Sequence, residues 1–63
     1  SVIISLWDVE DESTSILFTK FYELLKSGKS KSESLRLAKM YLKNGTRFDH
    51  PFYWAPFVLI GES

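Results

Sequence analysis

Apolar residues fall into four blocks along the chain, separated by short polar stretches. The first block, residues 2–6, is a nearly continuous aliphatic run, which predicts a short strand buried on both faces. The last block, residues 52–60, ends in the sequence Phe-Val-Leu-Ile and predicts a second strand. Pro56 has no amide hydrogen for a ladder, so this strand either begins there or lies at a sheet edge.

The second block has the spacing of an amphipathic helix, expected from about residue 12 to residue 27. Its apolar stripe consists of Ile16, Leu17, Phe18, Phe21, Tyr22, Leu24 and Leu25. Asp11, or alternatively Asp8, is expected to cap the N-terminus, where a carboxylate also complements the helix dipole. Gly28 is expected to end the helix in the left-handed conformation.

The third block predicts a second helix that begins after Ser30 and ends at Asn44-Gly45. Ser30 and Glu33 have the spacing of a capping box. The expected buried face of this helix is Ser34, Leu35, Ala38, Tyr41 and Leu42. The core is expected to join both helices to both strands through Leu17, Phe21, Leu25, Leu35, Ala38, Leu42, Ile4 and Val58.

The predicted order of elements is therefore β-α-α-β, in a single α/β unit that spans residues 1–63. Each helix reverses the chain once, so the last strand returns antiparallel to the first. If the strands are neighbours, the two helices cover one face of the sheet and leave the other face bare. Because two strands alone are marginally stable in water, this face and both strand edges need a partner.

Composition supports the need for a partner. The chain has 63 residues, of which 44% are hydrophobic and 16% aromatic, and it has no cysteine. So small a domain commonly needs a disulfide, a metal or self-association for stability. Disulfides are impossible here, and a single histidine does not make a closed zinc site. We therefore expect a homodimer, with an interface formed by Trp7, Phe52, Trp54 and Phe57.

Charge argues against nucleic acid and against a membrane as partners. The formal net charge is zero, and the lysines alternate with apolar positions instead of forming one basic patch. No segment approaches the roughly 20 apolar residues of a membrane span, and the start lacks a signal-peptide pattern. The lack of cysteine fits a cytoplasmic protein, and the start inside a strand-like run fits a piece of a longer domain.

Candidate chemistry is sparse, and we expect neither a bound metal nor a cofactor. A cysteine nucleophile is lacking, and His50 is either a lone general base or a loop histidine that hydrogen-bonds the backbone beside Trp54. The acidic residues at positions 8–12 do not have the pattern of a calcium loop, and helix capping accounts for them. The aromatic residues Trp7, Tyr53, Trp54 and Phe57 either line a ligand pocket or pack in a core or interface.

Three stretches together resemble the C-terminal part of the CHAT domain, a caspase-like domain often attached to tetratricopeptide repeats. The first stretch is residues 2–9, followed by Asp11 and Thr14. The second comprises Phe21, Tyr22, Leu25, Gly28, Lys31, Leu35, Arg36 and Ala38. The third is the sequence His-Pro-Phe-Tyr-Trp-Ala at residues 50–55, followed by Phe57 and Gly61. They occur in the family's order and cover essentially the whole chain.

The resemblance implies that this chain is a fragment of a caspase-like three-layer fold, which supplies the last two sheet strands. In this family a histidine and a cysteine on upstream strands form the catalytic dyad, and no residue of this chain matches either. The chain is therefore expected to be non-catalytic, whereas its parent would be a cysteine endopeptidase acting on protein. The resemblance also places Trp7, Asp8 and Val9 in the loop that helps to form the wall of the substrate pocket. Asp8 would there receive a basic substrate side chain or, equally, cap the next helix.

Two hypotheses follow for the function. In the first, the chain is the C-terminal segment of a CHAT-type cysteine peptidase domain, and its partner is the N-terminal part of that domain. In the second, it is a small self-associating interaction module with no peptidase parent. The gene sequence upstream of Ser1 separates them, because only the first requires the dyad histidine and cysteine there.

Overall fold

The computed structural model describes residues 2–61, so Ser1 and residues 62–63 of the predicted unit 1–63 lie outside the described part. In chain order the elements are β1 (Val2–Ser5), α1 (Asp11–Lys26), α2 (Lys31–Gly45), the 3₁₀ helix η1 (Pro51–Tyr53) and β2 (Phe57–Ile60). The predicted β-α-α-β order is confirmed. The sequence reasoning missed η1, a single turn inside the expected connection to the last strand.

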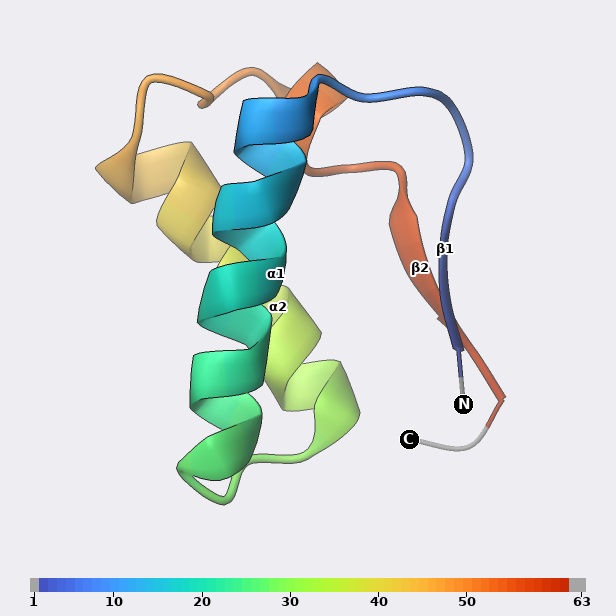
Figure 1. The fold of residues 1–63 in the computed structure, drawn as a ribbon, viewed down its shortest axis with the longest axis vertical. Helices are drawn as coiled ribbons and strands as arrows, with labels where there is room; N and C mark the ends of the chain where they lie inside the picture. The colour runs from blue at the N-terminus through green and yellow to red at the C-terminus, as the bar shows by residue number, and fades with distance from the viewer. Residues whose placement is uncertain (1, 62–63) are drawn as a thin grey trace.

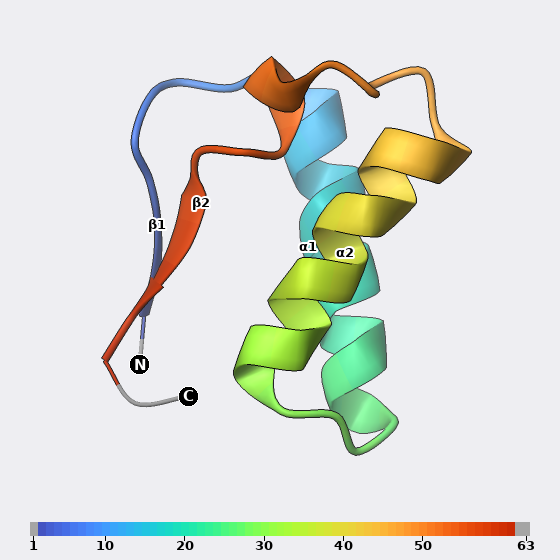
Figure 2. The same cartoon turned by 180° about the vertical axis from the view of Figure 1, so that it is seen from behind.

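The two strands form an antiparallel ladder beside a layer of two packed helices (Figures 1 and 2). The register pairs Val2 with Ile60 and Ser5 with Phe57. One more hydrogen bond, 3.0 Å from the Leu6 amide to the Pro56 carbonyl, extends the ladder beyond the strand ends. Pro56 has no amide hydrogen to donate, but its carbonyl accepts this hydrogen bond. Strand β2 begins directly after Pro56, which is one of the two predicted alternatives.

Helix α1 begins one residue earlier than expected, and both predicted caps are wrong. The N-cap is Glu10, whose Oε1 accepts a 2.7 Å hydrogen bond from the Ser13 amide. Its carbonyl also accepts hydrogen bonds from the hydroxyl groups of Ser13 and Thr14. Because the helix already includes Asp11, that carboxylate lies in the first turn and complements the helix dipole instead of capping.

The connection between the helices is a Schellman turn around Gly28, which has the left-handed φ of 101°. The Gly28 amide donates to the Leu25 carbonyl, and the Lys29 amide donates to the Leu24 carbonyl. Gly28 is therefore the predicted terminator. Ser30 then caps α2 by accepting a 3.2 Å hydrogen bond from the Glu33 amide, which is one half of the predicted capping box. The Glu33 carboxylate binds Arg36 instead.

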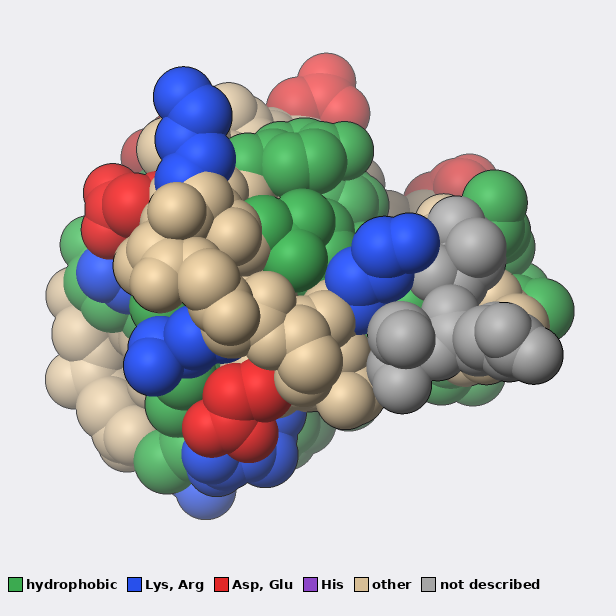
Figure 3. All heavy atoms as spheres, turned by 90° about the horizontal axis from the view of Figure 1, so that it is seen from below, with side chains coloured by type: hydrophobic (Ala, Val, Ile, Leu, Met, Phe, Trp, Pro, Cys, Tyr) green, Lys and Arg blue, Asp and Glu red, His purple; other side chains and the backbone are tan. Residues whose placement is uncertain are grey.

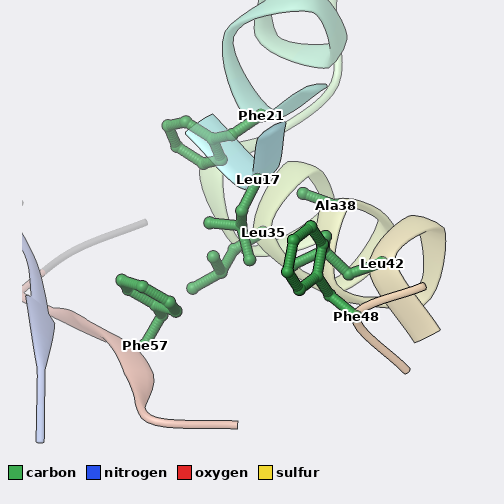
Figure 4. Close-up of a cluster of buried hydrophobic side chains, with 7 residues drawn as sticks. All are labelled: Leu17, Phe21, Leu35, Ala38, Leu42, Phe48 and Phe57. Carbon is green, nitrogen blue, oxygen red and sulfur yellow. The ribbon is translucent and has the colours of Figure 1, made fainter. Parts of the chain in front are cut away.

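Seven buried apolar side chains form the core between the helices and β2 (Figure 4). They are Leu17, Phe21, Leu35, Ala38, Leu42, Phe48 and Phe57. Figure 4 shows Phe57 pointing from β2 toward the helices, where its ring lies edge-to-face on Phe18 at a centroid distance of 5.7 Å. Phe48, from the loop after α2, packs at the other end of the cluster, and its role was not predicted.

The predicted core is wrong on the strands, where the two faces of the sheet have different environments. Ile3 and Leu59 pack against the core, whereas Ile4, expected to be buried, is 42% exposed, and Val58 is only half-buried. Side chains alternate between the faces of a strand, and the helices cover only one face. The first strand is therefore not buried on both faces within this chain.

Two helical positions are also less buried than predicted. Tyr41 is exposed, and Leu25 is only partly buried. Tyr41 lines a surface hollow together with residues of α1, and the Lys20 ammonium lies 5.0 Å from the centroid of its ring. Ser34, in contrast, is fully buried as expected, although its hydroxyl oxygen has no hydrogen-bond partner among the described residues. Its small volume allows the close approach of α1 and α2.

The side of the sheet that faces away from the helices carries an apolar surface, which we call the outer sheet face. It consists of Val2, Ile4, Val58 and Ile60, and Leu6 continues it past the end of β1. All are exposed except Val58, which is half-buried. A contiguous exposed apolar surface of this kind is a mark of an interaction site on a soluble protein.

Replacing Phe21 by alanine tests the core. The Phe21 ring is 4% exposed, whereas its neighbour Tyr22 is 59% exposed, so the two positions are a matched pair of aromatic residues. We expect Phe21→Ala to cost about 3–5 kcal/mol, or to unfold the chain, because it leaves a cavity in the core. Tyr22→Ala should cost less than about 1 kcal/mol.

Urea unfolding followed by circular dichroism measures both free energies. Equal losses for the two variants would show that the helical stripe faces elsewhere.

Candidate functional site

The loop between β1 and α1 is held against η1 by a single tryptophan. The Trp7 ring stacks on Phe52 with centroids 6.0 Å apart and planes inclined by 27°. Its indole Nε1 also donates a 3.1 Å hydrogen bond to the Phe52 carbonyl. Both rings remain substantially open to solvent, with 42% of Trp7 and 45% of Phe52 exposed. The two residues therefore form a fixed aromatic surface, which we call the aromatic platform.

His50 and Pro51 give Phe52 its position. The Phe52 amide donates a 3.1 Å hydrogen bond to His50 Nδ1, which caps η1, and Pro51 supplies the fixed φ of the first position. The turn is closed by hydrogen bonds from the Tyr53 amide to the His50 carbonyl and from the Ala55 amide to the Pro51 carbonyl. Of the two predicted roles for His50, the backbone hydrogen bond is therefore the one that its geometry supports.

The remaining two residues of the predicted pocket wall differ from each other. Val9 is half-buried and packs against the core, so it anchors the loop to the helices. Asp8 is exposed and has no hydrogen bond or ion pair with any other residue in the range 2–61. Because Glu10 is the cap of α1, Asp8 is free of the capping role that was its alternative interpretation.

The four aromatic residues of the predicted interface do not lie on one surface. Trp7 and Phe52 are exposed together, as described above. Trp54 is half-buried: its Nε1 donates to the Asp49 carbonyl at 3.0 Å. Phe57 is 3% exposed and belongs to the chain's own core, so it supports the sheet from inside and offers no surface to a partner.

The outer sheet face is the part of the candidate surface that the sequence reasoning did not assign to particular residues. Leu6 continues it beyond β1 and directly precedes Trp7, so it links the face to the aromatic platform. The sequence carries little signal for it: Val2, Ile4 and Leu6 share one face of a strand, but Ile3 on the other face is equally apolar. The run therefore predicts a strand buried on both faces, and the exposed face is visible only in the structure.

Three ionisable side chains of α2, which lie outside the candidate surface, have shifted pKa values. The hydrogen bond with Arg36 lowers the pKa of Glu33, and the same contact raises the pKa of Arg36. Burial lowers the pKa of Lys39. On the face shown in Figure 3, basic and acidic side chains are interspersed over the helices instead of forming one patch.

Two hollows of about 290 Å³ each lie away from the aromatic platform. The first is lined by Ser15, Ile16, Thr19, Lys20, Glu23 and Tyr41, and the second by Val2, Ile3, Phe18, Phe21, Tyr22, Leu25, Lys31 and Leu59. Within residues 2–61, no three His, Cys, Asp or Glu side chains are grouped to hold a metal ion. The helices of this same range are too short or too polar to cross a membrane.

Comparison with known proteins identifies one matching family and two related proteins. The CHAT domain family matches residues 1–62. Tetratricopeptide repeat protein 28 of Homo sapiens is 35% identical over 61 residues, which are 97% of this chain and 2% of that protein. The Mus musculus protein of the same name matches with the same identity and coverage, so the chain spans only 2% of the length of these relatives. No solved structure matches the chain.

Substitutions of His50 test whether its ring positions the aromatic platform. We expect His50→Ala to cost about 0.5–1.5 kcal/mol and to speed hydrogen exchange of the Phe52 amide, because the acceptor is lost. His50→Asn should retain slow exchange, because an asparagine oxygen also caps such a turn.

Amide exchange measured by NMR distinguishes the two variants, and the Trp7 indole signal reports the platform. Slow exchange of the Phe52 amide that persists in His50→Ala would mean that the imidazole has no such role.

Proposed function

Because the chain belongs to the CHAT domain family, we propose that it is the C-terminal segment of a CHAT-type, caspase-like domain. In this role it supplies the last two strands of the sheet, β1 and β2. The loop of Trp7, Asp8 and Val9 forms part of the wall of a substrate pocket, and the parent domain acts on protein. The partner of the chain is the N-terminal part of its own domain.

The outer sheet face is the observation that carries this proposal. In the described chain the helices cover only the side of the sheet that carries Ile3 and Leu59. The opposite side presents exposed Val2, Ile4 and Ile60 to water, which is unfavourable by about 25 cal/mol per Å² of apolar surface. A three-layer fold places a second layer of helices on that side and removes the surface from water.

The strand edges support the same arrangement. The described sheet has two strands, so each has one edge whose amide and carbonyl groups lack a strand partner. Further strands of a parent domain would continue the ladder and satisfy these groups. The two-stranded ladder is then the edge of a larger sheet.

We assign no catalytic residue to this segment. A cysteine peptidase requires a thiolate, and the chain contains no cysteine. Its one histidine accepts a hydrogen bond at Nδ1 from the Phe52 amide and acts as a cap. In keeping with the family resemblance, the nucleophile and its base therefore come from the remainder of the parent domain. This chain contributes two strands of the sheet and part of the pocket wall.

A complex with the remainder of the domain tests the proposal. The protein segment encoded upstream of Ser1, produced separately, should bind this chain in a 1:1 complex. Ile4→Lys should weaken the complex at least about tenfold, because it buries a charge against the second layer. Met40→Lys is the matched control, since Met40 is 44% exposed and Ile4 is 42% exposed.

Isothermal titration calorimetry measures the affinities, and thermal unfolding confirms that both variants fold alone. The proposal would be contradicted by a gene that encodes no histidine and cysteine pair upstream of Ser1. It would also be contradicted if Ile4→Lys and Met40→Lys changed the affinity equally.

The second candidate function is a small self-associating interaction module. The observation in its favour is that Leu6, which extends the exposed outer sheet face, directly precedes Trp7 of the exposed aromatic platform in the chain. Two copies that place these surfaces together around a two-fold axis would cover both at once. Both candidate functions use the outer sheet face. In the first it is covered by the rest of the parent domain, and in the second by another copy of this chain.

Sedimentation equilibrium of the isolated chain tests self-association. We expect a dimer at high micromolar concentration, because the outer sheet face is then covered by a second copy. Ile4→Lys should return the chain to a monomer, whereas Met40→Lys should not. A well-folded unsubstituted monomer throughout this concentration range would remove this candidate.

A further inference from the structure

His50 carries the one imidazole of the chain, and it caps η1 through a nitrogen atom that has to be unprotonated. The Phe52 amide donates a 3.1 Å hydrogen bond to His50 Nδ1. A neutral imidazole accepts at one nitrogen and donates at the other, whereas an imidazolium donates at both. The cap therefore requires the neutral ring, with its proton on Nε2.

The residue that His50 caps is the one to which the loop between β1 and α1, residues 6–10, is attached. The Trp7 indole Nε1 donates a 3.1 Å hydrogen bond to the Phe52 carbonyl, and the two rings stack with centroids 6.0 Å apart. Both sides of the Phe52 main chain are thus in use, its amide by His50 and its carbonyl by Trp7. Loss of the cap loosens the attachment of this loop.

The surroundings of His50 leave its ring open to solvent protons. The side chain is exposed, and within residues 2–61 it forms no ion pair. The charged side chains of the adjoining segments are Asp8, Lys43, Arg47 and Asp49. Of these, Arg47 is paired with Glu12 at 2.7 Å, and Lys43 lies over the Trp54 ring.

We infer that His50 is a pH-sensitive switch that attaches the loop of residues 6–10 to η1 in neutral solution and releases it in mildly acidic solution. Protonation of Nδ1 places an N–H group against the Phe52 amide, so that two donors face each other and the cap is lost. Imidazole is the side chain that ordinarily changes its charge between about pH 5 and 8. Because the neutral ring makes the hydrogen bond, the attachment is present at the higher pH and weakens as the pH falls.

NMR of the isolated chain at about pH 8 and about pH 5 tests the inference. The ring protons of His50 report its protonation directly. The protection factor of the Phe52 amide, which corrects for the intrinsic pH dependence of exchange, should fall about two- to tenfold at the lower pH, because one hydrogen bond is lost. The nuclear Overhauser effect between the rings of Trp7 and Phe52 should weaken over the same pH range in which the His50 ring gains its proton.

Two variants identify the group responsible. His50→Asn keeps an acceptor for the Phe52 amide but does not titrate, so its protection factor should agree within about twofold at the two pH values. Asp49→Asn removes the neighbouring carboxylate and should respond to pH as the unsubstituted chain does. The inference would be overturned by contacts that persist once His50 is fully protonated, or by an equal pH response in His50→Asn.

Far-UV circular dichroism at both pH values separates release of the loop from unfolding of the chain. We expect the helical signal of α1 and α2 to be the same at both. A helical signal that is lost together with the contact between Trp7 and Phe52 would also overturn the inference, since the change would then be global. The switch is a property of this chain alone and stands or falls separately from the proposed parent domain.

Discussion

The contact between Phe57 and Phe18 joins the sheet to the helices, and the rest of the structure depends on it. It turns one face of β2 toward α1 and α2, with Leu59 and, across the ladder, Ile3 on the same side. Since strand side chains alternate, the same contact turns Val2, Ile4 and Ile60 away. The buried core and the exposed outer sheet face therefore both follow from the orientation of β2 relative to the helices.

A second anchor links the ends of the ladder to the candidate site. The Trp7 indole and the cap formed by His50 meet at one residue, Phe52, through its carbonyl and its amide. Both hydrogen bonds join a side chain to the main chain of Phe52, whose ring stays exposed, and the Trp7 bond holds together two segments distant in sequence. This arrangement gives a rigid surface at a place where a loop would otherwise be mobile.

The sequence predicted the fold well and the site only in part, for physical reasons. Helix periodicity, the capping serine at Ser30 and the terminator Gly28 act locally, so they identified both helices and the antiparallel return of the chain. Burial of a strand depends on what covers each face, which a short aliphatic run does not reveal. For this reason Ile4 was misplaced, and Phe57 was assigned to an interface although the core contains it. The cytoplasmic location stays a prediction.

The position of the two strands at opposite ends of the described chain has a consequence for synthesis. The helices α1 and α2 are joined by one short turn, so their contacts form locally and fast. The ladder, in contrast, pairs Val2 with Ile60 and closes a loop of almost the whole chain. During synthesis β1 therefore pairs with β2 only after residues 57–60 have emerged from the ribosome. Until then, the edge of β1 that β2 covers in the folded chain is open to pairing with other strands.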